Sequence, residues 1–112
     1  MKGERTMIVR ELLEIVDATK QNEVPDNLKL QWINDVEGRV QCEIHRIAPK
    51  KVRVVASDED ELTLPQPYCS AYTLFIVSMI EFAEGNYSDY ARLSLEFEKN
   101  LEIYAKWYIR NA

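Results

Sequence analysis

The sequence predicts a mostly α-helical domain, a four-helix bundle with a short β-hairpin or an extended loop between its second and third helices. Apolar residues recur at three- and four-residue spacing in four separate stretches, which is the pattern of helices that bury one face. Pro and Gly residues divide these stretches from one another. At 112 residues and 46% hydrophobic composition, the chain has the size and apolar content of a single domain covering residues 1–112.

The first two helices are predicted at about residues 7–18 and 27–47. Thr6 is a suitable N-cap for the first, and Pro25 opens the second. The second helix is expected to continue across Gly38 and to end before Pro49. Their apolar positions are Ile8, Leu12, Ile15 and Val16 in the first helix, then Trp32, Ile33, Val36, Val40, Ile44 and Ile47 in the second.

A hairpin is predicted after Pro49. Residues 51–56 (KVRVVA) are rich in β-branched side chains, and residues 61–64 (ELTL) alternate between polar and apolar. Residues 57–60 would form the tip between the two strands. The sequence thus favours a small β insert in an otherwise helical chain.

The third helix is predicted from Pro67 to Glu84, with Gly85 as its terminating residue. It is apolar nearly all round, so we expect it to be the central and most buried helix. The fourth helix begins after Asn86 or Ser88, either of which can cap it. Its apolar stripe continues to the end of the chain through Tyr90, Leu93, Phe97, Leu101, Tyr104 and Tyr108.

Three apolar side chains of the fourth helix lie off this stripe, namely Leu95, Ile103 and Trp107. In an isolated bundle these positions would face water. Scattered exposed apolar residues are normal on a protein surface. The alternative is that this second face packs against another molecule.

Composition argues against several classes of partner. With 14 Lys and Arg against 19 Asp and Glu, the formal charge is −5 and the sequence pI is about 4.9. Such a chain is unsuited to gripping nucleic acid or an anionic membrane surface. The most apolar window, residues 71–80, is too short to span a membrane. Two cysteines and the absence of a signal-like apolar N-terminus indicate a reducing compartment.

Catalytic and metal chemistry find little support. His45 is the only histidine, and it falls opposite the apolar stripe of the second helix, so we expect it to be solvated or at an interface. Cys42 and His45 form a C-x-x-H spacing, but zinc would need further ligands such as Cys69 and a carboxylate. The sequence therefore predicts no enzyme, cofactor or metal. An enzyme or metal protein using Cys42 and His45 is the least supported alternative.

Two carboxylate pairs on helices are candidates for acid–base chemistry. Asp35 with Glu37, and Glu81 with Glu84, lie on helices whose other faces carry the apolar stripe. We expect all four carboxylates to be solvated.

Charge is distributed unevenly in the predicted hairpin. The basic residues Arg46, Lys50, Lys51 and Arg53 are followed at once by the acidic residues Asp58, Glu59, Asp60 and Glu61. The first interpretation is a solvated hairpin whose two strands neutralise each other. The second is a bipolar loop that meets the same loop on the next subunit, positive to negative, in a head-to-tail ring.

Three segments carry a family resemblance. They are LQWINDVEGRV at residues 30–40 followed by Glu43 and Ile44, PQPY at residues 65–68 before an apolar helix, and GNY at residues 85–87 before the aromatic last helix. Together they resemble the head-tail connector, or adaptor, proteins of tailed phages and prophages, over most of the chain. The resemblance implies a helical bundle with a loop insert, no catalysis, and assembly into a ring on the portal protein that joins the DNA-filled head to the neck or tail.

The implied partners are copies of the chain itself, the portal protein, and the next neck or tail-completion protein. DNA would pass nearby without specific binding, no membrane would be involved, and the location would be the virion neck, or the host bacterial cytoplasm during assembly. Residues 107–112 are a candidate for docking on the portal. The candidate interface residues are Arg46, Lys50, Lys51, Arg53, Asp58, Glu59, Asp60, Glu61, Leu95, Ile103, Trp107 and Arg110. The alternative function is a small acidic helical module that binds another protein without forming a ring.

Overall fold

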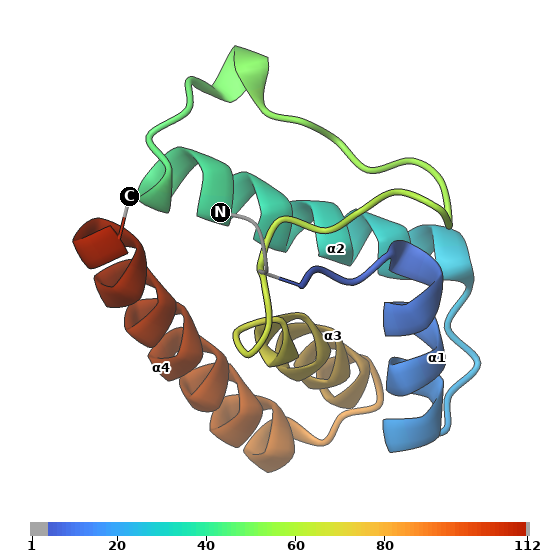
Figure 1. Cartoon of the computed structure of the whole chain (residues 1–112). Coiled ribbons are helices and arrows are strands. Elements are labelled where there is room, and N and C mark those ends of the chain that lie inside the picture. Colours follow the sequence, from blue (N-terminus) through green and yellow to red (C-terminus); the bar gives the residue numbers. More distant parts are fainter. Residues whose placement is uncertain (1–4, 112) are drawn as a thin grey trace.

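A computed structural model of the chain describes residues 5–111, and this part of the chain is mostly helical (Figure 1). Its α-helices are α1 (Val9–Thr19), α2 (Asp26–Arg39), α3 (Ser70–Ala83) and α4 (Tyr87–Asn111). The π-helical turn η1 (Val40–Ile44) continues α2, and the short 3-10 helix η2 (Pro49–Lys51) follows. The predicted mostly helical fold with four helices is confirmed. No helix in the described part is long and apolar enough to cross a membrane.

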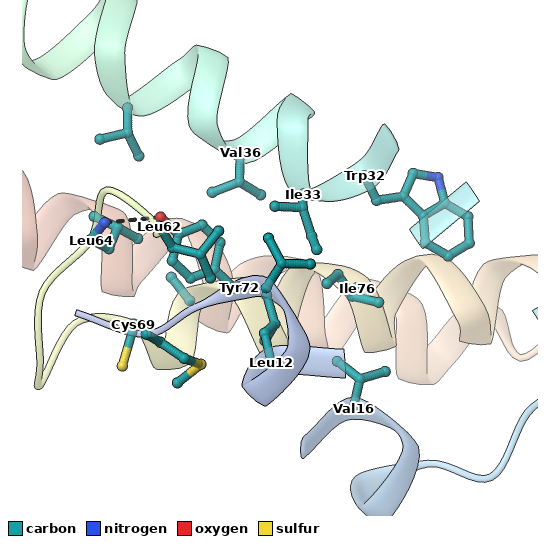
Figure 2. Packing of buried hydrophobic residues seen from close by; sticks show 14 of the residues in the cluster. Leu12, Val16, Trp32, Ile33, Val36, Leu62, Leu64, Cys69, Tyr72 and Ile76 are labelled. Carbon is teal, nitrogen blue, oxygen red and sulfur yellow. Dashed lines mark hydrogen bonds between the residues drawn. The ribbon is translucent and has the colours of Figure 1, made fainter. Parts of the chain in front are cut away.

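Helix α3 is the centre of the structure, as its composition predicts. In Figure 1 it lies between α1 and α4, and α2 crosses over it. Residues 71–81 are all buried or half-buried. The core draws fully or almost fully buried side chains from each helix, such as Leu12, Ile33, Tyr72 and Phe97. Figure 2 shows how the first three of these helices meet around Tyr72 and Ile76.

The turn between α3 and α4 depends on Gly85. This residue has a φ of 83°, in the left-handed region that favours glycine. The N–H of Asn86 donates to the carbonyl of Glu81 (2.8 Å) and the N–H of Gly85 to that of Phe82 (3.1 Å), which together form a Schellman motif. The Asn86 side chain, one of the two predicted caps for α4, donates instead to the Glu81 carboxylate at 2.8 Å.

The predicted second helix is shorter than expected and changes its winding near the end. Its last turn is the π-helical Val40–Ile44, where the N–H of His45 donates to the carbonyl of Val40 (3.0 Å). The chain then leaves the helix through Arg46, at a φ of 61°. A π turn holds one residue more than an α turn, so the following side chains are rotated by about 100°.

Of the two alternatives predicted for the insert, the β-hairpin is wrong, and the described chain has the extended loop. Residues 61–66 pair with the N-terminal segment before α1 and not with residues 52–56. The N–H of Leu62 donates to the carbonyl of Met7 (2.8 Å), and Gln66 donates to Arg5 (2.7 Å). The only β-bridge among the described residues joins Ile8 and Glu61. Local alternation of side chains does not reveal that a segment more than 50 residues away supplies the partner.

The cap of α1 also differs from the prediction. Ile8, and not Thr6, is the N-cap residue, while the Thr6 hydroxyl donates to Glu61 (3.3 Å). The first N–H groups of a helix have no partner within it. In α1, those of Val9 and Arg10 donate to main-chain carbonyls of the 58–60 turn, at 3.0 and 2.9 Å. The acidic turn is therefore fixed to the start of α1.

Candidate functional site

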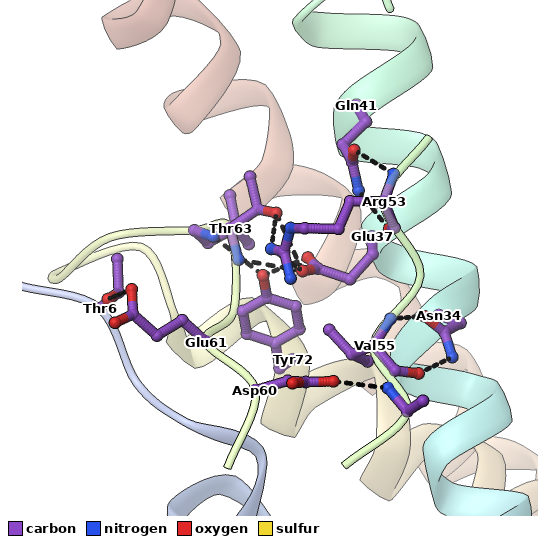
Figure 3. A network of polar contacts seen from close by, with 12 residues as sticks. Thr6, Asn34, Glu37, Gln41, Arg53, Val55, Asp60, Glu61, Thr63 and Tyr72 are labelled. Atoms are coloured by element: carbon purple, nitrogen blue, oxygen red, sulfur yellow. Dashed lines mark hydrogen bonds and ion pairs between the residues drawn. The ribbon is translucent and has the colours of Figure 1, made fainter. Parts of the chain in front are cut away.

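The connection between α2 and α3 is the largest non-α-helical part of the described chain, and a polar face of α2 and η1 holds its extended segment, residues 52–56 (Figure 3). The Asn34 side chain bonds both main-chain groups of Val55, at 2.9 Å each. Gln41 does the same for Arg53, at 2.9 and 3.0 Å. Two side-chain amides thus take the place that a neighbouring strand would have in a sheet.

Glu37 lies between these amides and is completely buried. Its carboxylate accepts hydrogen bonds from the Tyr72 hydroxyl and from the N–H and hydroxyl of Thr63, at 3.0 and 2.9 Å. The Arg53 guanidinium stands 3.4 Å away. A buried carboxylate is costly unless it is fully bonded, and these partners meet that requirement. Burial and the nearby Glu37 charge raise the pKa of the Tyr72 hydroxyl far above its usual value.

The expectation that all four paired carboxylates are solvated is wrong for two of them. Glu37 is buried for the reason just given, and Glu81 is only 9% exposed, lying 3.5 Å from Lys20 and accepting from Asn86. Asp35 and Glu84 are exposed. Because Glu37 points into the core and Asp35 out of it, they do not form a pair for acid–base chemistry. Glu37 is instead a structural group that joins α2, α3 and their connection.

The position predicted for His45 is also wrong, because the π turn rotates it toward α4. Its Nε2 lies 2.7 Å from the Tyr104 hydroxyl oxygen, and its ring stacks on Tyr108 with centroids 4.2 Å apart. Burial lowers the pKa of this imidazole. Trp107, predicted to lie on the wet back of the helix, is half-buried and packs on Tyr68 and Tyr104. These aromatic contacts fix the C-terminal half of α4 to the bundle.

The three residues considered for zinc lie in different environments. Cys69 is buried in the core, whereas Cys42 is half-buried in a shallow groove between α2 and the extended segment. His45 faces the aromatic residues of α4. Within residues 5–111, no three His, Cys, Asp or Glu side chains are grouped so as to hold a metal ion.

The cross-strand ion pairs of the first interpretation do not form among the described residues, although the Arg53 charge helps to lower the pKa of Asp60 after its two main-chain hydrogen bonds. Within residues 5–111, no ion pair joins the basic residues 46–53 to the acidic residues 58–61. Arg53 turns to Glu37 and Thr63, and Glu59 pairs with Arg10. Asp60 accepts the N–H groups of residues 56 and 57, which hold the pKa of its carboxyl below the usual value.

Several charged side chains of the connection make no hydrogen bond or ion pair with residues 5–111. Lys50, Lys51 and Asp58 are of this kind, and all three are exposed. These charges are available to a partner. Arg46 is also exposed, at the left-handed turn that ends η1.

The outer face of α4 presents a second surface. Leu95 and Ile103 are each 58% exposed, and Ile109 is 77% exposed. Arg110 beside them is exposed too, while Ala112 at the end of the predicted portal-docking segment lies outside the described residues. Leu95 and Ile103 thus lie on the surface as the sequence analysis expects, and only Trp107 departs from that group.

Comparisons with protein-family models, with curated proteins and with solved structures find no match for this chain. The features that the sequence reasoning missed are the buried Glu37 and the amides of Asn34 and Gln41. Their signal was a line of polar residues at helical spacing beside the apolar stripe of α2. Such a line is more often solvated, and only the tertiary contacts show that it holds main chain here.

Proposed function

We propose that the chain is a non-enzymatic connector, or adaptor, of a tailed phage or prophage, which forms a ring on the portal protein and joins the head to the neck or tail. The proposal starts from the resemblance of residues 30–40, 65–68 and 85–87 to that family. Its location would be the virion neck after assembly in the host cytoplasm. The mostly helical fold with a long irregular connection is compatible with this role.

The observation that carries the proposal is the exposed apolar surface on α4. Leu95 and Ile103 lie two turns apart on a helix whose opposite face already fills the core through Leu93, Phe97 and Leu101. Within residues 5–111, both side chains remain more than half exposed. Burial of apolar surface against a neighbouring subunit would stabilise a closed ring through many identical contacts.

The charge of the chain fits a protein that surrounds DNA. A formal charge of −5 for each subunit, repeated around a ring, produces a negative field in the channel. DNA phosphates are repelled by such a field, so DNA would pass without specific binding. The chain alone is therefore expected not to retain DNA on a column at low salt.

Two substitutions on α4 test the proposal. Leu95→Glu with Ile103→Glu places charge on the outer face without touching the core, so the fold should persist. We expect the unmodified chain to co-sediment with the portal protein of the same phage as a multi-copy complex. The double variant should no longer co-sediment with the portal protein. Ile15→Glu, at a position of α1 that is 41% exposed, is the matched control.

The outcomes separate the two functions considered. Equal binding of the double variant and the control would remove α4 as the contact. A single copy bound to a partner, with no further copies added at any concentration, would favour the small acidic interaction module over the ring.

A further inference from the structure

The extended segment 52–56 has one occupied main-chain edge and one free edge. Arg53 and Val55 turn their N–H and C=O groups toward Gln41 and Asn34. In extended chain, the residue between them turns these groups to the opposite edge. The N–H and C=O of Val54 have no hydrogen-bond partner in the part of the chain that the structure describes, and its side chain is 65% exposed. In Figure 1 the connection between α2 and α3 forms the outer rim beyond α2.

The unpaired charges are arranged evenly about Val54. In the sequence, Lys50 lies four residues before Val54 and is followed directly by Lys51, and Asp58 lies four residues after Val54. All three side chains are exposed, and among the described residues none of them makes a hydrogen bond or an ion pair, although the Asp58 charge acts on Arg10. The segment is therefore positive at its start, apolar and β-branched in the middle, and negative at its end.

We propose that this edge pairs with the same segment of a second copy of the chain, antiparallel about a two-fold axis at Val54. In this register the two Val54 residues lie opposite each other and exchange two N–H···O=C bonds. The antiparallel direction also brings the η2 end of each segment, with Lys50 and Lys51, toward the turn that carries Asp58 in the other copy. The surface is self-complementary, as a two-fold contact requires.

Charge complementarity selects this occupant. Parallel pairing would place Lys50 near its own equivalent, and like charges in register are destabilising. An extended segment of another protein, without this charge order, would gain only the main-chain bonds. These bonds are few, because the N–H groups of Val52 and Ala56 already donate to Pro49 and Asp60. The charges therefore decide both the strength and the direction of the contact.

This pairing goes beyond the connector proposal and does not rest on it, because it concerns the chain alone. It also changes the expected geometry of the bipolar loop from head-to-tail to two-fold. Two copies related by a two-fold axis form a closed pair through this surface.

One experiment removes the main-chain donor. Val54→Pro deletes an N–H that the fold does not use, and its fixed φ suits extended chain. Val54→Thr keeps the N–H and the β-branched shape and is the matched control. We expect a reversible dimer in sedimentation equilibrium on approaching about 1 mM for the unmodified chain and the Thr variant, and a monomer for the Pro variant. Circular dichroism verifies that both variants are folded.

A second experiment reverses the charges. Lys50→Glu with Lys51→Glu makes both ends of the segment negative, and Asp58→Lys places a positive charge where the segment meets Lys50 and Lys51 of the other copy. Each variant alone should dimerise at least about fivefold more weakly, because attractive pairs become repulsive. An equimolar mixture of the two variants should recover the original affinity. In the mixed dimer, the substituted start of one variant meets the substituted end of the other, and these carry opposite charges.

The possible results are decisive. A monomeric unmodified chain at about 1 mM, or a mixture that associates no better than its components, would overturn the pairing. Neither result affects binding of the chain to the portal through α4, so failure of this inference is distinguishable from failure of the proposed function.

Discussion

The Tyr72 hydroxyl donates a hydrogen bond to the buried Glu37 carboxylate, and the same hydroxyl oxygen accepts the N–H of Leu64 at 2.9 Å. One residue of α3 therefore connects a charged group of α2 to the main chain of the connection between them. The geometry of that connection depends on a polar network inside the core, and the exposed segment 52–56 is presented by that network (Figure 3).

Removal of Glu37 should destabilise the protein strongly. Glu37→Ala leaves the Tyr72 hydroxyl and both Thr63 donors without an acceptor, and each buried unsatisfied group costs about 1–3 kcal/mol. We expect a loss of about 3 kcal/mol or more in the free energy of unfolding by urea. Asp35→Ala on the exposed face of the same helix should change it by about 0.5 kcal/mol or less. Similar effects for both variants would contradict the structural role of Glu37.

The two amides that hold the extended segment should control its accessibility. Asn34→Ala with Gln41→Ala removes the side chains that bond Val55 and Arg53, so residues 50–53 should be cut by trypsin about fivefold faster, with helix content unchanged. Gln31→Ala, at an exposed position of α2, is the control. A cleavage rate that is the same in both variants would show that other contacts hold the segment.

Two glycines should respond oppositely to substitution by alanine. Gly85→Ala forces a side chain into a φ of 83° and should cost about 1 kcal/mol. Gly38→Ala lies within α2, where an added Cβ meets no atom within 4 Å, and should stabilise by about 0.5–1 kcal/mol. Thermal unfolding of the two variants measures this contrast. Effects of the same sign would contradict the assigned backbone conformations.

The stability of the protein should fall as pH falls below the ordinary pKa of histidine, about 6.5. Burial lowers the pKa of His45 in the folded state, so the unfolded chain takes up the proton first. The stabilisation is complete above the unfolded pKa and is lost as pH decreases toward the folded one. His45→Gln should flatten the dependence of urea midpoint on pH between about 7 and 5.5. An unchanged slope in this variant would assign the dependence to other groups.

Carboxylates affect the stability of the protein at lower pH than His45 does. Hydrogen bonds to Lys29, to main-chain N–H groups and to Arg39 lower the pKa values of Asp17, Asp60 and Glu98, respectively. Their contributions to stability are present at pH above the pKa values of the unfolded chain, near 4. These contributions are lost as pH falls through the pKa values of the folded protein. The His45 effect is therefore measurable by itself above about pH 5.5.

The helices could be predicted from the sequence because each carries its own apolar face. The stripe of α4 and the all-round apolar character of α3 are local properties, and the structure places both as expected. Gly85 was also predictable, because a helix that ends in a left-handed turn favours glycine. The periodic pattern across Gly38 could not reveal the π turn at Val40–Ile44, and so the orientation of His45 was wrong.

The polar interior could not be predicted in the same way. A carboxylate on a helix is usually solvated, and the partners of Glu37 lie 26 and 35 positions away at Thr63 and Tyr72. The hairpin prediction failed for a related reason, since the partner of Leu62 is Met7, which is distant in the sequence and adjacent in the fold. Both cases depend on tertiary contacts that override local pattern.

The central claim is that many copies of this chain assemble on a portal. Native mass spectrometry of the chain mixed with the portal protein of the same phage tests it most directly, with the Leu95→Glu and Ile103→Glu double variant as control. The account predicts one dominant complex in which a closed set of chains occupies each portal ring, and its loss in the double variant. A portal that binds no chain, or only a single copy at saturating concentration, would contradict it.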